Sequence, residues 1–314
     1  MLTTPDFGQS ARPIFIIGAP RSGTSITNWV VGQLPNVQTM PESTWIATLS
    51  MGAYLSYTYG SMRGRYSHLS NVDYALSAFM RRIGEAADAI VQDCFDERCH
   101  RLYGNYRSTG QLQLSAEQAK SQFQVRRTPD EAKQRWIDGT PFNSYWTWGL
   151  NLMFPDAQFI HNLRRPDDVA TSLEGFDKFG LDSVALKEGL DVWSSHTEHA
   201  RLAELAFGSK RVFRLHFERL SADPEALLRE LCEFLGEEYD ANCLLPLSTR
   251  INSSDVDHKR SENLAQLHRM PEFQDCMSLY QGIVDGSHGS VPDLAALDVL
   301  RTRFVQYSMD HPLI

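Results

Sequence analysis

The first residues with the types and spacing for chemistry form the segment Gly18 to Ser25, Gly-Ala-Pro-Arg-Ser-Gly-Thr-Ser. It follows the apolar run Pro13 to Gly18, which is typical of a strand buried on both faces, and precedes a predicted helix from Thr24 to Leu34. Glycines let backbone N–H groups turn toward a phosphate, and the N-terminus of a helix adds positive potential. The segment therefore predicts a phosphate-binding loop. Its place between strand and helix disfavours the alternative, a tight turn with an incidental arginine.

The glycine spacing is that of a Walker A loop, but Thr24 stands where such a loop has its lysine. Lysine and magnesium neutralise the β- and γ-phosphates during nucleoside triphosphate hydrolysis, and the chain shows no obvious partner for magnesium. A P-loop kinase or nucleoside triphosphatase is therefore the second hypothesis. Arg21 can supply positive charge at the same end of the ligand, because a guanidinium suits a sulfate or phosphate oxyanion.

A second candidate site begins where another predicted strand ends. The run Gln158 to Leu163 is predicted to be a strand, Arg164 closes it, and Ser172 lies on the helix predicted from about Pro166 to Leu173. Taken alone, the segment fits equally well as a solvated pair of arginines followed by a surface serine.

Together these segments resemble the PAPS-dependent sulfotransferases, where PAPS is 3′-phosphoadenosine 5′-phosphosulfate. Pro20 to Ser25 looks like the 5′-phosphosulfate loop of that family, especially of its bacterial and tyrosylprotein-type branch, and Arg164 to Ser172 resembles the motif that binds the 3′-phosphate. The resemblance implies a sulfotransferase that moves a sulfuryl group from PAPS to a hydroxyl or similar nucleophile and releases PAP, with no metal expected. Donor-binding residues implied by the two motifs are Arg21, Ser22, Gly23, Thr24, Ser25, Arg164 and Ser172.

Two later segments extend the resemblance, which runs from about Pro13 to Asp255. Phe217-Glu218-Arg219-Leu220 is similar to the family's Tyr-Glu-Asp-Leu strand end, with Phe217 in place of the tyrosine. Phe217 keeps the aromatic ring on which an adenine can stack, but it lacks the tyrosine hydroxyl and its hydrogen bond. Asn252-Ser253-Ser254-Asp255 resembles the family's late loop over the nucleotide, which implies a donor contact by Ser253.

Glu42 is the candidate general base, since the acceptor hydroxyl must lose a proton. It follows the first loop and helix, from where the next connection can return a carboxylate to the phosphate loop, and it matches the catalytic glutamate of tyrosylprotein-type enzymes. Pro41 and Glu42 would also suit the first turn of a helix, and both interpretations can hold together. The resemblance assigns catalysis to Glu42 and Arg21.

The segment Asp138-Gly139-Thr140 departs from the family pattern, because Gly139 stands where a catalytic lysine is often found. Arg21 is expected to supply the missing charge. Asp138 or Thr140 faces the acceptor, or else takes part in an ordinary turn. Gly139 also prompts a third hypothesis, a non-catalytic nucleotide-binding protein.

Histidines offer a weaker alternative for the base. His161 lies within a predicted strand, and His196 and His199 lie on a predicted helix with Trp193. Structural roles are the default for all three, and a histidine base in place of Glu42 stays open.

Strand, loop and helix follow one another at three places, ending with the strand Arg211 to His216 and a helix from about Pro224 to Leu235. This order predicts an α/β fold, a P-loop-type parallel sheet flanked by helices, with a fourth short strand at Trp136 to Asp138. We expect a single domain over 1–314 with a helical insertion over 52–134. Helices are expected at Val72 to Val91, Ala116 to Phe123, Tyr145 to Phe154 and Asp293 to Tyr307.

The composition of the 314-residue chain, 42% hydrophobic and 22% charged, is that of a globular protein with a sizeable core. A net charge of −9 argues against a nucleic-acid binder but allows a local cationic pocket. No secretion signal or transmembrane run is found, so a cytoplasmic protein is expected. Five cysteines without CxxC spacing indicate neither a disulfide framework nor a zinc site. The acceptor, whether a small metabolite, lipid, sugar or peptide, and the oligomeric state are left open.

Overall fold

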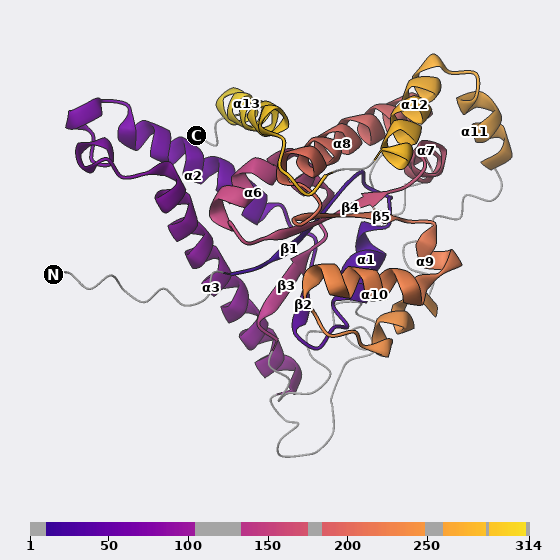
Figure 1. Cartoon of the computed structure of the whole chain (residues 1–314), viewed down its shortest axis with the longest axis horizontal. Coiled ribbons are helices and arrows are strands. Elements are labelled where there is room, and N and C mark those ends of the chain that lie inside the picture. The colour runs from indigo at the N-terminus through magenta and orange to yellow at the C-terminus, as the bar shows by residue number, and fades with distance from the viewer. Residues whose placement is uncertain (1–10, 104–132, 175–183, 249–259, 287–288, 312–314) are drawn as a thin grey trace.

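A five-stranded parallel sheet forms the centre of the computed structural model, which describes residues 11–103, 133–174, 184–248, 260–286 and 289–311 (Figure 1). The strand order is β2-β3-β1-β4-β5, and every pair is parallel. This confirms the predicted α/β fold. The strands are β1 Ile14–Ile17, β2 Val37–Met40, β3 Arg135–Asp138, β4 Gln158–Leu163 and β5 Val212–His216.

Four of the five strands are where the sequence predicts them, and β2 is the one that was not predicted. Its four residues are all buried, yet only Val37 and Met40 are apolar. Gln38 is tolerated inside because its side-chain amide donates to the carbonyl of Lys133, 2.9 Å away. A strand of this composition has no continuous apolar run to reveal it.

Helices connect and cover the strands. The α-helices are α1 Thr24–Val31, α2 Trp45–Ser61, α3 Leu76–Tyr103, α6 Thr147–Met153, α7 Pro166–Glu174, α8 Leu186–Phe207, α9 Arg219–Ala222, α10 Pro224–Leu235, α11 Arg260–Leu267, α12 Pro271–Asp285 and α13 Leu294–Asp310. Short 3₁₀ helices are η1 Gly64–Tyr66, η2 Ser70–Val72, η3 Pro141–Trp146 and η4 Ala241–Ser248.

The predicted helix boundaries are partly wrong. The helix predicted to begin at Val72 begins at Leu76, because η2 occupies Ser70–Val72, and it continues to Tyr103. The helix predicted from Tyr145 is divided between η3 and α6. By contrast, α10 begins and ends at the predicted residues, where Pro224 opens the helix and Gly236 closes it in the left-handed conformation. The helix predicted at 116–123 lies outside the described residues.

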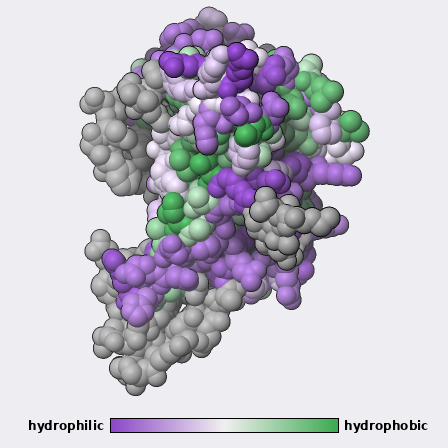
Figure 2. Space-filling model, turned by 90° about the vertical axis from the view of Figure 1, so that its left-hand side faces the viewer, coloured by the Kyte–Doolittle hydropathy of each residue, from purple (hydrophilic) through white to green (hydrophobic). Residues whose placement is uncertain are grey.

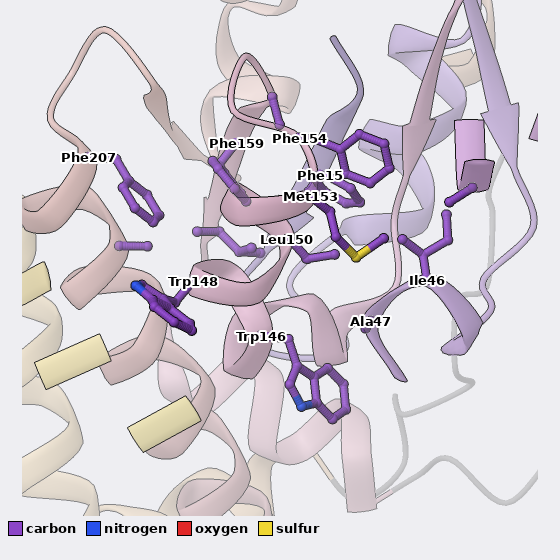
Figure 3. Close-up of a cluster of buried hydrophobic side chains, with 14 of the residues drawn as sticks. Phe15, Ile46, Ala47, Trp146, Trp148, Leu150, Met153, Phe154, Phe159 and Phe207 are labelled. Carbon is purple, nitrogen blue, oxygen red and sulfur yellow. The ribbon is translucent and has the colours of Figure 1, made fainter. Parts of the chain in front are cut away.

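Side chains of β1 alternate between two cores, one on each face of the sheet. Ile14 and Ile16 pack with residues of α1 and α10 on one face. Phe15 and Ile17 pack on the other face with α2, α3, α6, α8 and α13. Figure 3 shows part of this second core, in which Phe15 lies near Phe154, Phe159 and Met153. The sheet is therefore held from both faces.

The described part of the predicted insertion at 52–134 is helical and shares the second core. Met80, Val91 and Phe95 of α3 are buried in the same cluster as Phe15 and Trp136. The side of the molecule that carries α2 and α3 is mostly hydrophilic, with hydrophobic residues gathered in limited groups (Figure 2). Among the described helices, none combines the length and apolar character needed to cross a membrane.

Candidate functional site

The carboxyl ends of the five strands bring the candidate residues to one edge of the sheet. Because all strands run in the same direction, whatever follows each strand lies at this edge, which is where open α/β sheets bind ligands. The phosphate loop follows β1, Glu42 follows β2, Asp138 ends β3, Arg164 follows β4 and Phe217 follows β5.

The phosphate loop is a tight turn with an unusual backbone. Arg21 and Gly23 have φ angles of 65° and 96°, in the left-handed region. The hydroxyl of Ser22 donates to the carbonyl of Ala19 at 2.6 Å, so this side chain closes the turn. A Cβ atom at Gly23 would lie 2.3 Å from the ring of Phe217. Glycine is therefore required at position 23 both for its conformation and for the close approach of this ring.

Neighbouring segments hold the base of the loop. The hydroxyl of Ser144, on η3, accepts from the backbone N–H of Gly18 at 2.8 Å. The amide of Asn162, on β4, donates to the hydroxyl of Thr27 on α1 at 2.9 Å. The loop is thereby fixed to the segment after β3, and the helix that follows the loop is fixed to β4.

Four predicted donor-binding residues meet at this edge. Arg21 Nε donates to the hydroxyl of Ser172 at 3.0 Å, and Arg164 Nη1 donates to the carbonyl of Arg21 at 2.9 Å. The guanidinium of Arg164 also lies over the ring of Phe217, 4.4 Å from its centroid. Trp193 Nε1, on α8, donates to the carbonyl of Arg164 at 2.9 Å and holds the end of β4 in place. The residues predicted for the two ends of the donor thus form one continuous site.

Two arginines bring positive charge to this site, and two carboxylates lie beside them: Glu42 acts on Arg21, and Asp168 Oδ2 lies 4.0 Å from Arg164 Nε. The pKa of Arg21 is lowered by burial and by the nearby charge of Arg164, and Glu42 partly offsets the effect. An arginine keeps its charge in such surroundings. Two guanidinium groups held close together therefore favour an anion, which would relieve their repulsion and accept their hydrogen bonds.

Glu42 faces the phosphate loop, where Oε1 accepts from the hydroxyl of Ser25 at 3.1 Å. Surrounding protein raises the pKa of the Glu42 carboxyl by desolvation, while the Ser25 hydrogen bond and the charge of Arg21 oppose the rise. The residue is still exposed, so water screens these interactions. The alternative placement of Glu42 in the first turn of a helix does not hold, because α2 begins at Trp45 after Thr44.

Asp138 and Thr140 are buried at the end of β3. The Thr140 hydroxyl lies 2.5 Å from Asp138 Oδ1, and it also contacts the backbone of Ser43. Burial raises the pKa of Asp138 to about 6, and hydrogen bonds from the hydroxyl and the backbone N–H of Thr140 oppose the rise. These contacts support the turn interpretation of Asp138 and Thr140 over direct contact with the acceptor.

The histidines have structural partners. His161 Nδ1 lies 2.8 Å from Oε1 of Glu204 in the interior. His196 is buried against Tyr145, whose hydroxyl lies 3.0 Å from Nδ1, and burial lowers the pKa of His196 to about 4. Within the residues that the structure describes, no three His, Cys, Asp or Glu side chains gather as a metal site would require. Ser253 lies outside the described residues.

Sequence reasoning missed the supporting role of Thr140 and two further residues, Ser144 and Asn28, whose amide donates to the carbonyl of Met40. Ser144 and Asn28 carry no motif, and their contacts depend on the packing of segments far apart in the chain. Thr140 was considered only as a turn or acceptor residue, and its contact with Ser43 could not be found without β2. An Asp-x-Thr spacing at a strand end was the one available signal, since the aspartate can accept from the backbone N–H two residues later, here at 2.9 Å.

Comparison with known protein families gives one match. The model of the sulfotransferase family matches residues 13–241. An uncharacterized protein of Aquifex aeolicus (strain VF5) is 26% identical over 247 residues, which cover 77% of this chain; the chain spans only about a quarter of that protein, 26% of its length.

Two solved structures resemble the chain over most of its length. The sulfotransferase domain of the Synechococcus PCC 7002 olefin synthase is 17% identical with a TM-score of 0.44, covering 99% of this chain and 98% of that one. The sulfotransferase from Alicyclobacillus acidocaldarius is 16% identical with a TM-score of 0.42, covering 92% of this chain and 99% of that one. The family match, and not these distant likenesses, assigns the chain.

Proposed function

The chain belongs to the sulfotransferase family, and on this premise we propose that it transfers the sulfuryl group of PAPS to a hydroxyl or similar nucleophile. One observation carries the proposal. A phosphate loop without the Walker lysine is joined by Arg164 and Ser172 on one side and by the carboxylate of Glu42 on the other. This transfer needs anion-binding groups for the donor and a base for the acceptor, and the phosphate loop, Arg164, Ser172 and Glu42 are suited to these roles.

Donor binding is divided among the strand ends. We assign the 5′-phosphosulfate to the backbone N–H groups of the loop, the N-terminus of α1 and the side chain of Arg21. Arg164 and Ser172 are assigned to the 3′-phosphate. Phe217 is assigned to the adenine, which can stack on its ring. The hydroxyl and the backbone N–H of Ser22 both donate to the carbonyl of Ala19, so Ser22 is expected to support the donor by shaping the loop. Ser253 is retained as a donor contact on the family resemblance.

The chemistry assigned to Glu42 is removal of the acceptor proton. As the acceptor oxygen forms a bond to sulfur, the bond between sulfur and the 5′-phosphate oxygen breaks, and PAP leaves with that electron pair. The acceptor proton moves to Glu42. Arg21 stabilises the negative charge that develops on the leaving oxygen, because it lies in a half-buried site beside a second arginine. A raised pKa makes Glu42 a better base than an ordinary carboxylate.

A screen with ³⁵S-labelled PAPS tests the activity and the acceptor class together. Purified protein is incubated with panels of phenols, alcohols, sugars, lipids and peptides, and labelled products are separated from PAPS. The proposal predicts transfer of label to at least one panel and equal formation of PAP. Magnesium-dependent turnover of ATP would favour the kinase or triphosphatase instead. PAP binding without transfer to any panel would favour a non-catalytic nucleotide-binding protein.

For location and acceptor, we propose a cytoplasmic enzyme that acts on a small metabolite, lipid, sugar or peptide. The tyrosylprotein-type branch is likewise retained as a prediction, since the family match does not extend to that branch.

A further inference from the structure

We propose that Asp138 and Thr140 are the positioning residues for Glu42: the hydroxyl of Thr140, oriented by Asp138, holds the backbone next to the base. This inference rests on the proposed function, in which Glu42 removes the acceptor proton. It also assigns a role to the segment in which this chain departs from the family pattern.

A chain of hydrogen bonds connects the buried carboxylate to the segment of the base. The backbone N–H of Ser43 donates to Thr140 Oγ1 at 3.0 Å, and Thr140 Oγ1 lies 2.5 Å from Asp138 Oδ1. The carbonyl of Ser43 is a second acceptor within reach of the hydroxyl, at 3.1 Å. A hydroxyl has only one proton, and a carboxylate is the stronger acceptor. The Thr140 proton therefore points to Asp138, which leaves its lone pairs for the Ser43 N–H.

The segment that carries Glu42 is held from a second side by α1. Asn28 Nδ2 donates to the carbonyl of Met40, the last residue of β2, at 2.9 Å. Met40 and Ser43 are thus fixed to different elements, and Glu42 lies between them. Its carboxylate makes the third contact, with Ser25. Three contacts over four residues give the base a defined direction toward the phosphate loop.

The same contacts leave little room beside position 139. A Cβ atom at Gly139 would lie 3.0 Å from Cβ of Asn28 and 3.2 Å from its Nδ2, the atom that donates to Met40. Asn28 would have to move by a few tenths of an ångström to admit a side chain there. The backbone at position 139 therefore packs against the side chain that holds the end of β2.

Burial shows that the Asp138–Thr140 pair is more than a surface turn. Asp138 is 0% exposed and Thr140 is 3% exposed. Within the described part of the chain, Asp138 Oδ2 has no hydrogen-bond partner. A buried carboxylate with one unused oxygen is costly to keep. A turn alone accounts for the contact between Asp138 and the backbone N–H of Thr140, but it leaves the contact with Ser43 unexplained.

The test compares Thr140→Val, which removes the hydroxyl at nearly constant shape, with Thr140→Ser, which restores it. Thr58→Val is the matched control, since the Thr58 hydroxyl bonds within α2 to the carbonyl of Tyr54. For each protein, the titration of Glu42 is followed by NMR with carboxyl-labelled glutamate, assigned with Glu42→Gln. Single-turnover transfer and PAP affinity are measured on the same preparations.

Thr140→Val is expected to slow transfer on the order of 10- to 100-fold, the usual effect of a small misplacement, with PAP affinity unchanged. A freed Glu42 gains water, so its titration and the acid limb of the pH–rate profile move to lower pH. The charged groups that act on Glu42 are Arg21 from the phosphate loop and Asp138 from β3. Thr140→Ser is expected to recover most of the rate, and Thr58→Val to behave as the wild type.

The outcomes separate this inference from the proposed function. If Thr140→Val leaves both the Glu42 titration and the rate per folded molecule unchanged, the positioning role is wrong. If the wild type transfers no label but the titration moves in Thr140→Val, the positioning contact stands and the proposed activity fails. Should Thr140→Val not fold, Asp138→Asn takes its place, because it keeps the shape and weakens the acceptor of the Thr140 proton; an unchanged titration there also overturns the inference.

Discussion

Glu42 and Ser25 come from segments that follow different strands, and the 3.1 Å hydrogen bond between them brings a carboxylate to the phosphate loop. At the scale of single residues, this contact separates two interpretations of Glu42. A residue in the first turn of a helix would act on stability through the helix dipole. Glu42 lies before α2 begins, so it is not in the first turn of that helix, and its side chain contacts the phosphate loop.

The first prediction concerns Glu42→Gln, which keeps the size of the side chain and removes the basic oxygen. Transfer to an identified hydroxyl acceptor should fall by about 10²–10⁴-fold, the usual contribution of general base catalysis. PAP affinity and melting temperature should stay close to those of the wild type. Single-turnover kinetics and PAP titration on one preparation check both. Near-wild-type turnover in the folded variant would remove Glu42 from the mechanism.

A second prediction at this scale follows from the pKa of Asp138, which burial raises from 3.8 to about 6. A group whose pKa is higher in the folded state contributes stability that is fully present below pH 3.8 and is lost as the pH rises through about 6. Asp138→Asn does not titrate and lacks this component. Between pH 4.5 and 7 the wild type should therefore lose roughly 2 kcal/mol of unfolding free energy relative to the variant.

Denaturant unfolding of wild type and Asp138→Asn at the two pH values measures this difference. If the unfolding free energies of the two proteins changed with pH in the same way, Asp138 would titrate as an exposed aspartate does. The raised pKa of Asp138 at the end of β3 would then be wrong.

The sequence predicted the main side chains of the site because they follow strands in short motifs. Arg21, Arg164 and Ser172 were assigned in this way, and the structure brings them together. What could not be predicted are contacts between segments far apart in the chain. Thr140 and Ser43 are 97 residues apart, and their contact depends on the pairing of β2 with β3.

At the scale of elements, the phosphate loop and the end of β5 constrain each other. The ring of Phe217 occupies the space where a side chain at position 23 would be, while Arg164 lies over the same ring. The loop therefore takes its shape from its own backbone and from the segments after β4 and β5.

The third prediction is that Gly23→Ala destabilises the protein and weakens PAP binding. Its φ angle of 96° disfavours any side chain, and the new methyl group would meet the Phe217 ring 2.3 Å away. A loss of about 1–3 kcal/mol is expected for a strained residue of this kind. Gly282→Ala on α12 is the control, because a Cβ there meets nothing within 4 Å, and it should be neutral or slightly stabilising. Equal melting temperatures for the two variants would contradict the account of the loop.

Strands and helix ends were likewise predicted where a short local pattern marks them. Strand β1 is a continuous apolar run, β4 contains the adjacent apolar residues Phe159 and Ile160, and both were found. Helix α10 was found with both of its ends because Pro224 and Gly236 mark them. β2 was missed because Gln38 and Thr39 separate its two apolar residues, whereas Trp136 and Ile137 of β3 are adjacent. The start of α3 was placed too early because η2 continues the helical pattern without joining the helix.

At the scale of the whole molecule, an acidic chain brings two arginines together in its candidate site. The net charge is −9, yet Arg21 and Arg164 lie together at the carboxyl edge of the sheet. Helices on both faces hold the five strands, so the edge that carries the site is fixed by the entire core (Figure 1). Selectivity for a doubly phosphorylated nucleotide is then expected from the arrangement of these arginines, because the overall charge would repel any anion.

The most direct test of the account is calorimetric titration of the wild type and Arg164→Ala with PAP and with ADP. The two nucleotides carry the same number of phosphate groups, and only PAP has one at the 3′ position. Wild-type protein should bind PAP roughly ten- to a hundred-fold more tightly than ADP, the value of a charge-assisted contact of about 1.5–3 kcal/mol. Arg164→Ala should lose this preference while its ADP affinity changes little. Equal affinities of the wild type for PAP and ADP would contradict a site built for PAPS.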